Sequence, residues 1–212
     1  MLLIRIVLCN CYIVFMNMFN INEIFYSLQG EGFWTGRPAV FVRFSGCNLK
    51  CPFCDTNHHV VRSYNMDDLV SEIIKCKSDF VVMTGGEPSL FINKELVDAL
   101  HYHHKYVEVE TNGTHSLPDN VDWITLSPKN AFVGNADVVL EGVDEVKVVY
   151  TPQSVGYLPK YENFNAKYFF LQPCDMGDEK KNEEMLQDTI DYCLDHPQWS
   201  LSLQTHKIIG VR

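Results

Sequence analysis

The sequence predicts an α/β protein built as a partial, open barrel, and three observations indicate it. Segments with the pattern of strands alternate with segments with the pattern of helices along most of the chain. The glycine-bearing and polar motifs follow the carboxyl ends of the strands, where β/α barrels carry their sites. A full eightfold barrel is crowded in 212 residues, so we expect an open barrel trimmed of some helices.

The composition restricts the class of protein. A length of 212 residues with 46% hydrophobic residues allows one respectable core, so we expect a single domain. Lys and Arg number 17 against 27 Asp and Glu, a net charge of −10 that repels phosphate backbones and disfavours nucleic-acid binding. The eight cysteines are unevenly clustered, which favours a reducing compartment, and we expect the cytoplasm.

The first residues are treated separately. Residues 1–15 are apolar enough to look like a short signal or anchor. They are short for a transmembrane helix, and no small-residue cleavage site follows them, so we expect no membrane association. We expect residues 1–17 to be a non-native or disordered extension, with the biological start at Met16 or Met18. The single domain then spans residues 18–212.

The most informative stretch is residues 41–56, F-V-R-F-S-G-C-N-L-K-C-P-F-C-D-T, which holds Cys47, Cys51 and Cys54 at C-x3-C-x2-C spacing. An iron-sulfur cluster of four irons normally takes four cysteine ligands. A loop that offers three leaves one iron open for an outside ligand, and chemistry can take place at that iron.

Two other uses of these cysteines fit the sequence less well. A zinc site of four ligands needs a second C-x2-C pair or histidines at short spacing. The chain has no second C-x2-C pair, and the nearby candidates are His58 and His59. A disulfide is weaker still, because three cysteines cannot all pair with one another and the others are scattered.

The cysteine loop resembles that of the radical S-adenosylmethionine (SAM) superfamily, in which an aromatic residue, here Phe53, precedes the third cysteine. The resemblance implies the partial, open (β/α) barrel of the radical SAM type and a [4Fe-4S] cluster on Cys47, Cys51 and Cys54. The fourth iron would bind the amino and carboxylate groups of SAM, and the reduced cluster would cleave SAM to a 5'-deoxyadenosyl radical. Phe53, Cys54 and Asp55 are then expected to contact SAM.

The stretch before the loop contains a glycine-rich turn. Ile21, Ile24 and Phe25 are expected to pack inside, and the glycines after Leu28 predict an irregular segment, Q-G-E-G. Taken alone, this segment is a turn with solvated polar residues.

A strand with an unusual charge follows. Pro38–Phe44 is rich in β-branched and aromatic residues, which predicts a buried strand leading into the cysteine loop. Arg43 lies in this apolar run, where a charge is costly unless paired. It therefore either bridges a structural carboxylate or faces an anionic ligand.

Together these features resemble the 7-carboxy-7-deazaguanine synthase family, which carries F-x-S-x-Q-G-E-G, here residues 25–32, and an arginine ahead of the cysteine loop. The resemblance implies that the pterin substrate is held by four residues of these two segments: Leu28, Gln29, Gly30 and Arg43. It also implies that Thr56 supplies an oxygen to Mg²⁺, a cation that prefers oxygen ligands.

The next elements are a helix and a strand. Residues 65–76 have a cap residue, early acids and apolar positions that predict a helix whose inward face holds Leu69, Val70, Ile73 and Ile74. Residues 80–84 predict a short buried strand that leads into T-G-G-E-P, where Glu87 could anchor an amine. The resemblance implies that Gly86 contacts SAM and Thr84 the substrate. The alternative is a plain strand-to-helix turn.

The central part of the chain repeats the alternation. Residues 93–104 predict a helix, and Tyr106–Thr111 alternates like a strand closed by a turn. Glu110 at its carboxyl end resembles a position that meets SAM, and the alternative is an exposed acid. Trp123–Leu126 predicts a strand leading into S-P-K. The resemblance implies SAM contacts for this triplet: Ser127, Pro128 and Lys129. Surface exposure is the alternative for Lys129.

The last part of the chain supplies strands at Glu145–Tyr150 and residues 167–172, a helix at 181–194 packed outside the sheet, and a final strand at 200–203 followed by a tail. The segment Q-P-C-D matches a SAM contact of the family: Gln172, Pro173, Cys174 and Asp175. Cys174 is not at cluster spacing. The family's terminal residue reaches the substrate, which makes Arg212 a candidate, and His206 is a candidate acid or base.

The resemblance covers residues 19–212 and implies conversion of 6-carboxy-5,6,7,8-tetrahydropterin to 7-carboxy-7-deazaguanine with loss of ammonia, a step of queuosine (7-deazapurine) biosynthesis. It implies a homodimer and a reductant such as flavodoxin or ferredoxin. The main alternative is a glycyl-radical-enzyme activase, which shares the G-C-N-L-x-C loop. An electron-transfer or structural iron-sulfur module is a further alternative, but it has no need of G-G-E-P or an open iron.

Overall fold

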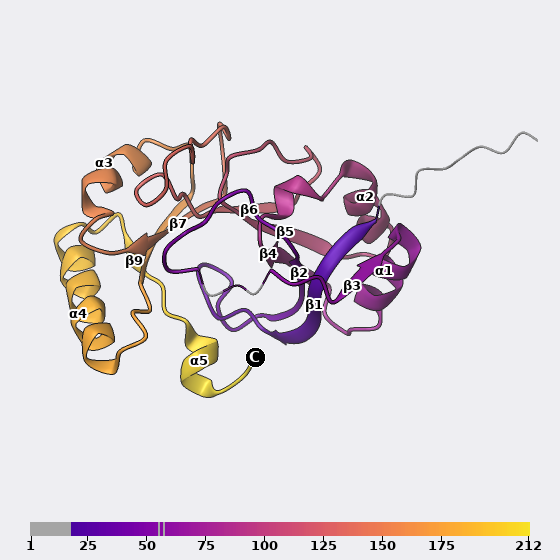
Figure 1. Ribbon diagram of the computed structural model, residues 1–212, viewed down its shortest axis with the longest axis horizontal. Helices are drawn as coiled ribbons and strands as arrows, with labels where there is room; N and C mark the ends of the chain where they lie inside the picture. The colour runs from indigo at the N-terminus through magenta and orange to yellow at the C-terminus, as the bar shows by residue number, and fades with distance from the viewer. Residues whose placement is uncertain (1–17, 55, 57) are drawn as a thin grey trace, which may run out of the picture.

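The computed structural model describes residues 18–54, 56 and 58–212. The expectation for residues 1–17 and the SAM contact of Asp55 both lie outside these residues. Within them, nine strands form one sheet in the order β3-β1-β2-β4-β5-β6-β7-β8-β9 (Figure 1). The strands are β1 (Phe19–Leu28), β2 (Pro38–Phe44), β3 (Arg62–Tyr64), β4 (Phe80–Gly85), β5 (Tyr106–Thr111), β6 (Trp123–Leu126), β7 (Glu145–Tyr150), β8 (Tyr168–Pro173) and β9 (Ser200–Leu201).

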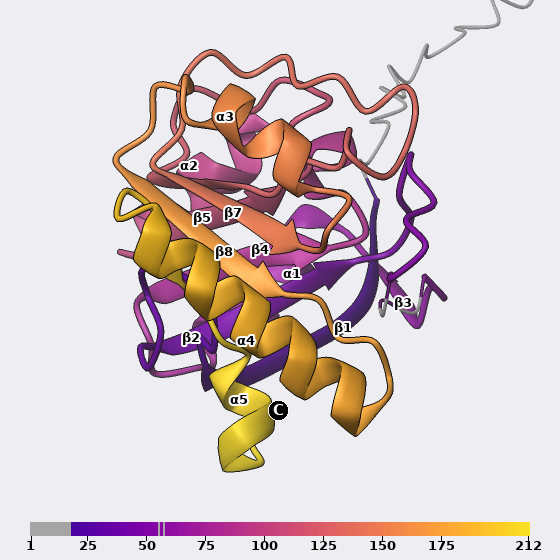
Figure 2. The same cartoon turned by 90° about the vertical axis from the view of Figure 1, so that its left-hand side faces the viewer.

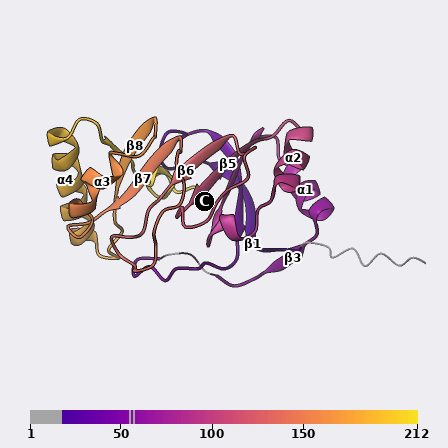
Figure 3. The ribbon, with the colours of Figure 1, turned by 90° about the horizontal axis from the view of Figure 1, so that it is seen from above.

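The parallel direction of most strands is that of the expected open barrel. From β2 through β9 every neighbouring pair is parallel, and only β1 and β3, on the other side of β2, run antiparallel to their neighbours. The sheet is curved and does not close, since β3 and β9 are its two edges (Figure 3). The predicted partial, open α/β barrel is confirmed. Its carboxyl-end loops all meet at one rim.

Most of the helices gather at the two ends of the curved sheet (Figure 3). They are α1 (Met66–Ile74), α2 (Lys94–Tyr102), α3 (Leu158–Tyr161), α4 (Glu179–Asp195) and α5 (Thr205–Ile209), with the short 3-10 turns η1 (Pro88–Leu90) and η2 (Val155–Tyr157). Helices α1 and α2 pack beside β1 and β5, and α4 packs along β8, as Figure 2 shows. No helix joins β5 to β6 or β6 to β7 in the described chain, which confirms the expected trimming.

Local sequence explains where the helices begin and which face they bury. Asn65 caps α1 by accepting from the Asp68 backbone N–H, and Asp178 caps α4 in the same way through Lys181. The inward face of α1 includes Leu69 and Ile73, as expected, whereas Ile74 lies on the exposed side. In the described residues no helix is both long and apolar enough to cross a bilayer.

The ends of the chain differ most from expectation. Residues expected only to pack before a loop form the ten-residue strand β1, which contains a bulge at residues 21–23 that breaks its alternation. The final strand β9 is two residues long instead of four, and the expected tail contains α5. Because β1 pairs with β2 across a long loop, its strand character depends on a partner that its own pattern does not reveal.

An aromatic floor closes the barrel at the amino ends of its strands. Phe33 and Trp34, from the loop after β1, pack against the first residues of four strands. The floor consists of Phe33, Trp34, Phe80, Tyr106, Trp123 and Tyr168. The Phe33 ring centroid lies 4.3 Å from that of Tyr168 and 5.0 Å from that of Trp123. The loop is therefore anchored inside the barrel, opposite the rim that carries the motifs.

Glu108 of β5 is buried in the barrel interior. Its side chain accepts from Thr125 Oγ1 at 2.8 Å, while its other oxygen is buried without a hydrogen-bond partner. Burial, with a further contribution from Glu110, raises the pKa of Glu108 to about 8. The folded protein therefore holds this carboxyl group protonated at neutral pH.

Replacing Glu108 with Gln is expected to make the free energy of unfolding less dependent on pH. The folded carboxyl group keeps its proton up to about pH 8, whereas the unfolded one loses it near 4.5, so wild-type stability falls as the pH rises between these values. The slopes should differ by up to about 1.4 kcal/mol per pH unit. Urea unfolding at several pH values measures them.

The control for this comparison is Glu183→Gln, which changes an exposed acid of α4 and should keep the wild-type slope. Equal slopes for Glu108→Gln and the wild type would show that Glu108 is already ionised in the folded state.

Candidate functional site

A cavity of about 480 Å³ opens at the carboxyl ends of the parallel strands. It brings together nearly all the residues singled out from the sequence. The candidates that line it are Leu28, Gln29, Gly30, Arg43, Cys47, Cys51, Phe53, Cys54, Thr56, Thr84, Gly86, Glu110, Ser127, Lys129, Gln172, Pro173, Cys174, Asp175, His206 and Arg212. Pro128 does not line the cavity and serves as the link between Ser127 and Lys129.

The cysteine loop is fastened at several points. The backbone N–H of Leu49 donates to Cys47 Sγ at 3.4 Å, and Cys54 N–H donates to the Cys51 carbonyl at 3.2 Å. Asn48 donates to Thr114 Oγ1 at 2.8 Å, which ties the loop to the segment after β5. Burial raises the pKa of the Cys47 and Cys51 thiols.

The donor set fits an iron-sulfur cubane. Cys47, Cys51 and Cys54 come from one loop, line one cavity and are not in disulfides. In the described residues no three side chains converge on a single metal ion, and a cubane binds each thiolate to a different iron. His58, weighed as a zinc ligand, has its Nε2 3.6 Å from Cys54 Sγ. A bound cluster would supply an open iron facing the cavity.

The G-G-E-P segment lies directly against the cysteine loop. A side chain at Gly86 would collide with the Gly46 carbonyl, and the Glu87 N–H donates to that carbonyl at 2.9 Å. Glycine is needed here for this close approach. Glu87, considered as an anchor for an amine, is 1% exposed. It accepts from Thr111 Oγ1 at 2.6 Å and from the Asn112 N–H at 2.7 Å, so it joins β4 to the end of β5.

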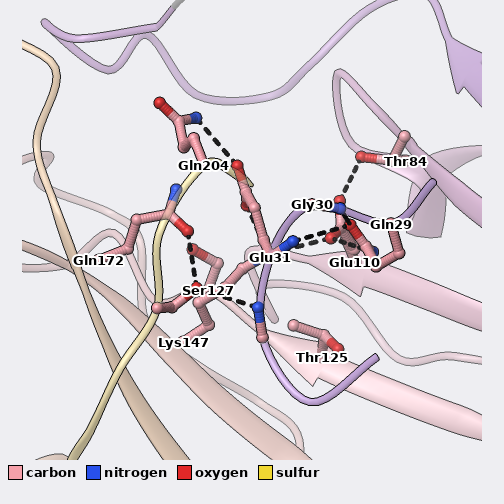
Figure 4. Close-up of polar contacts among 12 residues, drawn as sticks. Gln29, Gly30, Glu31, Thr84, Glu110, Thr125, Ser127, Lys147, Gln172 and Gln204 are labelled. Carbon is pink, nitrogen blue, oxygen red and sulfur yellow. Dashed lines mark hydrogen bonds and ion pairs between the residues drawn. The ribbon is translucent and has the colours of Figure 1, made fainter. Parts of the chain in front are cut away.

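An ion-pair network occupies the side of the cavity next to the Q-G-E-G loop (Figure 4). Lys147 Nζ of β7 lies 2.8 Å from Glu31 Oε2 and 3.0 Å from Glu110 Oε1. Thr84 Oγ1 and Gln29 Nε2 donate to Glu110 at 2.8 and 3.3 Å. Glu110, expected beside SAM, is therefore bonded to two residues expected beside the substrate.

Sequence reasoning missed Lys147 and gave Glu31 no role. The available signal was alternation, because Glu145 and Lys147 share one face of an otherwise apolar strand. Burial alone raises the pKa of Glu31, but the charge and hydrogen bond of Lys147 outweigh it and lower the pKa to about 2. Burial alone lowers the pKa of Lys147, and the neighbouring carboxylates raise it well above its ordinary value.

Arg43 forms the first of the two contacts expected of it, an ion pair with a structural carboxylate. Its position at the cavity also allows the second, a contact with an anionic ligand. Its Nε lies 2.8 Å from Glu23 Oε1 on the neighbouring strand, and its side chain also lines the cavity. Arg212 pairs with the second oxygen of Glu23, and its guanidinium lies 5.0 Å from the Phe25 ring centroid. Two guanidinium groups thus lie together at one wall of the cavity.

The segment after β9 closes this wall. Thr205 N–H donates to the Gly30 carbonyl at 3.0 Å, and a side chain at Gly30 would collide with His206. On the opposite wall, Lys129 Nζ donates to Ser127 Oγ at 2.5 Å, and burial lowers the pKa of Lys129.

Two further candidates have polar partners inside the protein. Thr56 Oγ1 donates to the Gly85 carbonyl at 3.4 Å. Asp175 pairs with Lys207 Nζ at 2.8 Å, and the hydrogen bonds it accepts from Lys207 and the Gly177 N–H lower its pKa.

The geometry and the comparisons with known proteins agree. Residues 41–146 match the model of the radical SAM superfamily. A 7-carboxy-7-deazaguanine synthase of Bacteroides thetaiotaomicron is 50% identical over 195 residues, covering 92% of this chain and 100% of the relative. One of Bradyrhizobium diazoefficiens is 40% identical, covering 91% and 98%. The crystal structure of QueE from Escherichia coli superposes with a TM-score of 0.71 at 28% identity, covering 88% and 93%.

The open barrel and its three-thiol loop define a radical SAM enzyme, which binds a [4Fe-4S] cluster and SAM. Such an enzyme needs a reductant to deliver the electron that starts its reaction. The identity and coverage of the relatives show the particular family within this superfamily. The chain belongs to the 7-carboxy-7-deazaguanine synthase family. The glycyl-radical activase alternative is not favoured.

Replacing Cys51 with Ala should abolish assembly of an intact four-iron cluster, because two thiolates then remain for three irons. Iron and sulfide content and the electron paramagnetic resonance spectrum after anaerobic reconstitution measure this. Cys174→Ala is the matched control, since Cys174 lines the same cavity but lies outside the loop. It should keep the wild-type spectrum, and equal iron loss in both variants would contradict the assignment of the three thiols.

Proposed function

We propose that the enzyme converts 6-carboxy-5,6,7,8-tetrahydropterin to 7-carboxy-7-deazaguanine with release of ammonia, a step of queuosine (7-deazapurine) biosynthesis. The observation that carries this proposal is that the cluster thiols and the Q-G-E-G loop line one cavity. The relatives that cover this chain almost entirely have this activity in their names. Cys47, Cys51 and Cys54 would hold the cluster, which together with SAM would supply the radical chemistry needed to remove a hydrogen from C6 of the pterin.

The SAM half of the cavity is assigned to residues near the cysteine loop. Gly86 brings backbone close to the cysteine loop, which would place its N–H and carbonyl groups within reach of SAM. The hydroxyl of Ser127 and the ammonium of Lys129 suit the ribose and carboxylate of SAM. The remaining SAM candidates are Phe53, Cys54, Asp55, Pro128, Gln172, Pro173, Cys174 and Asp175. Pro128 acts by placing its neighbours, since it does not line the cavity.

The substrate half is assigned to the opposite wall. Arg43 and Arg212 offer guanidinium groups that suit the substrate carboxylate. Leu28, Gln29 and Gly30 face the same space. Glu110 is proposed to contact the substrate rather than SAM, because its hydrogen-bond donors are Gln29, Thr84 and Lys147. A carboxylate there suits the N–H groups of a pterin ring.

Mg²⁺ is proposed at Thr56. Its hydroxyl lines the cavity on the side of Arg43 and keeps lone pairs free while donating to the Gly85 carbonyl. Mg²⁺ binds few protein groups and takes the rest of its shell from substrate and water. The substrate carboxylate would complete it.

The remaining expectations are kept as proposals. Residues 18–212 are proposed to form a single domain that acts as a homodimer in the cytoplasm, with flavodoxin or ferredoxin as electron donor. Reduced cysteines and an oxygen-sensitive cluster support a reducing compartment. The net charge of −10 supports a small-molecule substrate rather than a nucleic acid.

Anaerobic incubation of the reduced holoenzyme with SAM and the tetrahydropterin is expected to yield 7-carboxy-7-deazaguanine and ammonia, identified by mass spectrometry. SAM should be regenerated rather than consumed. Cleavage of SAM without any change in the pterin, combined with radical transfer to a glycyl-radical protein, would favour the activase.

Thr56→Val should weaken the stimulation of turnover by Mg²⁺, because it removes the proposed oxygen ligand while keeping the size of the side chain. The Mg²⁺ concentration that gives half-maximal rate is measured with SAM and pterin saturating. Thr35→Val is the control, since Thr35 is exposed and bonds only locally to the Gly32 carbonyl. An unchanged Mg²⁺ dependence in Thr56→Val would contradict the site.

A further inference from the structure

Lys147 occupies an unusual position for a lysine. It lies in the middle of β7, only 6% of its surface is exposed, and its ammonium group points into the barrel (Figure 4). It contacts Glu31 from the loop after β1 and Glu110 from the end of β5. One buried cation thus joins two segments that are far apart in the sequence, and all three residues line the cavity.

The remaining oxygens of both carboxylates are also bonded. Gln204 Nε2 donates to Glu31 Oε1 at 2.9 Å, and Thr84 Oγ1 donates to Glu110 Oε2 at 2.8 Å (Figure 4). Each carboxylate is therefore held through both oxygens, with Lys147 the partner common to the two. Such double fixation removes the rotational freedom that a single contact would leave.

Stability alone does not explain why a charge lies here. A buried ion pair is often no more stabilising than apolar residues of similar volume, because removing the charges from water costs as much as their attraction returns. A Met at this position could fill the same space between β6 and β8. The charge is then explained by what it does to Glu31 and Glu110.

We propose that Lys147 is a positioning residue that holds Glu31 and Glu110 as a fixed pair of acceptors for the N–H groups of the bound pterin. This inference rests on the proposed function, since it needs the pterin to occupy this half of the cavity. Lys147 acts through the two carboxylates and need not touch the substrate.

The surrounding charges show why the lysine matters. Glu145 and Glu108 also face Lys147, and burial raises the pKa of both. Two more titratable groups act here: the charge of His206 contributes to lowering the pKa of Glu31, and the charge of Lys147 contributes to lowering the pKa of the buried Lys129. Burial by itself also raises the pKa of Glu31, and the charge and hydrogen bond of Lys147 reverse this, with smaller contributions from Gln204 and His206.

Lys147→Met is therefore expected to raise KM for the tetrahydropterin by about tenfold or more at acidic pH, the effect of losing a charge-assisted acceptor. The ratio of variant to wild-type KM should shrink as the pH rises, because Glu31, which Lys147 no longer keeps ionised, then loses its proton without the lysine. KM for SAM, the cluster spectrum and the slow cleavage of SAM to 5'-deoxyadenosine in the absence of the pterin should stay near wild type. Lys147→Arg should restore much of the affinity and the flat pH profile.

Lys105→Met is the matched control, because Lys105 is also buried but donates to the Cys76 and Ser78 carbonyls away from the cavity. It should lower stability without changing the pH dependence of KM. A Lys147→Met enzyme with unchanged KM, or with a loss equal at every pH, overturns the inference. If Lys147→Met does not fold, Lys147→Gln carries the same comparison.

Two more variants separate this inference from the proposed function. Glu31→Gln and Glu110→Gln should each raise the pterin KM with little pH dependence. If both leave that KM unchanged, the assignment of the substrate half is wrong. If both raise it while the lysine variants behave like the wild type, the assignment stands and the role of Lys147 is wrong.

Discussion

The attachment of the loop after β1 inside the open barrel is the constraint on which the cavity depends. This loop is held at its far end by the aromatic floor, where Phe33 stacks on Trp123 and lies tilted against Tyr168. Closer to the cavity the Phe33 N–H donates to Glu145 Oε2 at 3.0 Å, and Lys147 binds Glu31. Alternate residues of β7 therefore hold the loop at two successive points.

Two glycines allow this close attachment. Gly32 has a φ of +64°, and a side chain there would collide with the Glu145 carboxyl group. A side chain at Gly30 would collide with the His206 ring. The glycines of Q-G-E-G thus permit β7 and the segment after β9 to approach the same short loop from two sides. Without that approach Gln29 and Glu31 would be the solvated turn residues that their composition suggests.

The sequence predicted the part of this arrangement that local pattern determines. The bounds of β2, β5, β6 and β7 agree with the alternation and composition of their own residues. Cys47, Cys51 and Cys54 could be grouped by their C-x3-C-x2-C spacing. Because a cluster normally takes four thiolates, this group of three predicted an iron open to another ligand. Because parallel strands end at one rim, motifs that follow them were expected to meet.

What the sequence did not predict depends on contacts between distant segments. β1 needs β2 as its partner, and α5 lies on the Q-G-E-G loop through Thr205 and Gly30. Lys147 falls within a correctly predicted strand, yet its role depends on Glu31, 116 residues earlier, and Glu110, 37 residues earlier. Periodicity places such a residue on a face but does not name its partners.

The contrast between local contacts and contacts of distant segments also distinguishes two halves of the cavity. The cysteine loop and G-G-E-P are joined by backbone contacts, such as the hydrogen bond from the Glu87 N–H to the Gly46 carbonyl. Most side-chain substitutions elsewhere would leave these contacts intact. The opposite half is held by side-chain charges from β5, β7 and the Q-G-E-G loop. With the two halves assigned as proposed, we expect substitutions among those charges to change which molecule binds while the cysteine loop keeps its geometry. The proposal therefore assigns substrate choice in this protein to ion pairs between distant segments, and the position of the cysteine loop to backbone contacts.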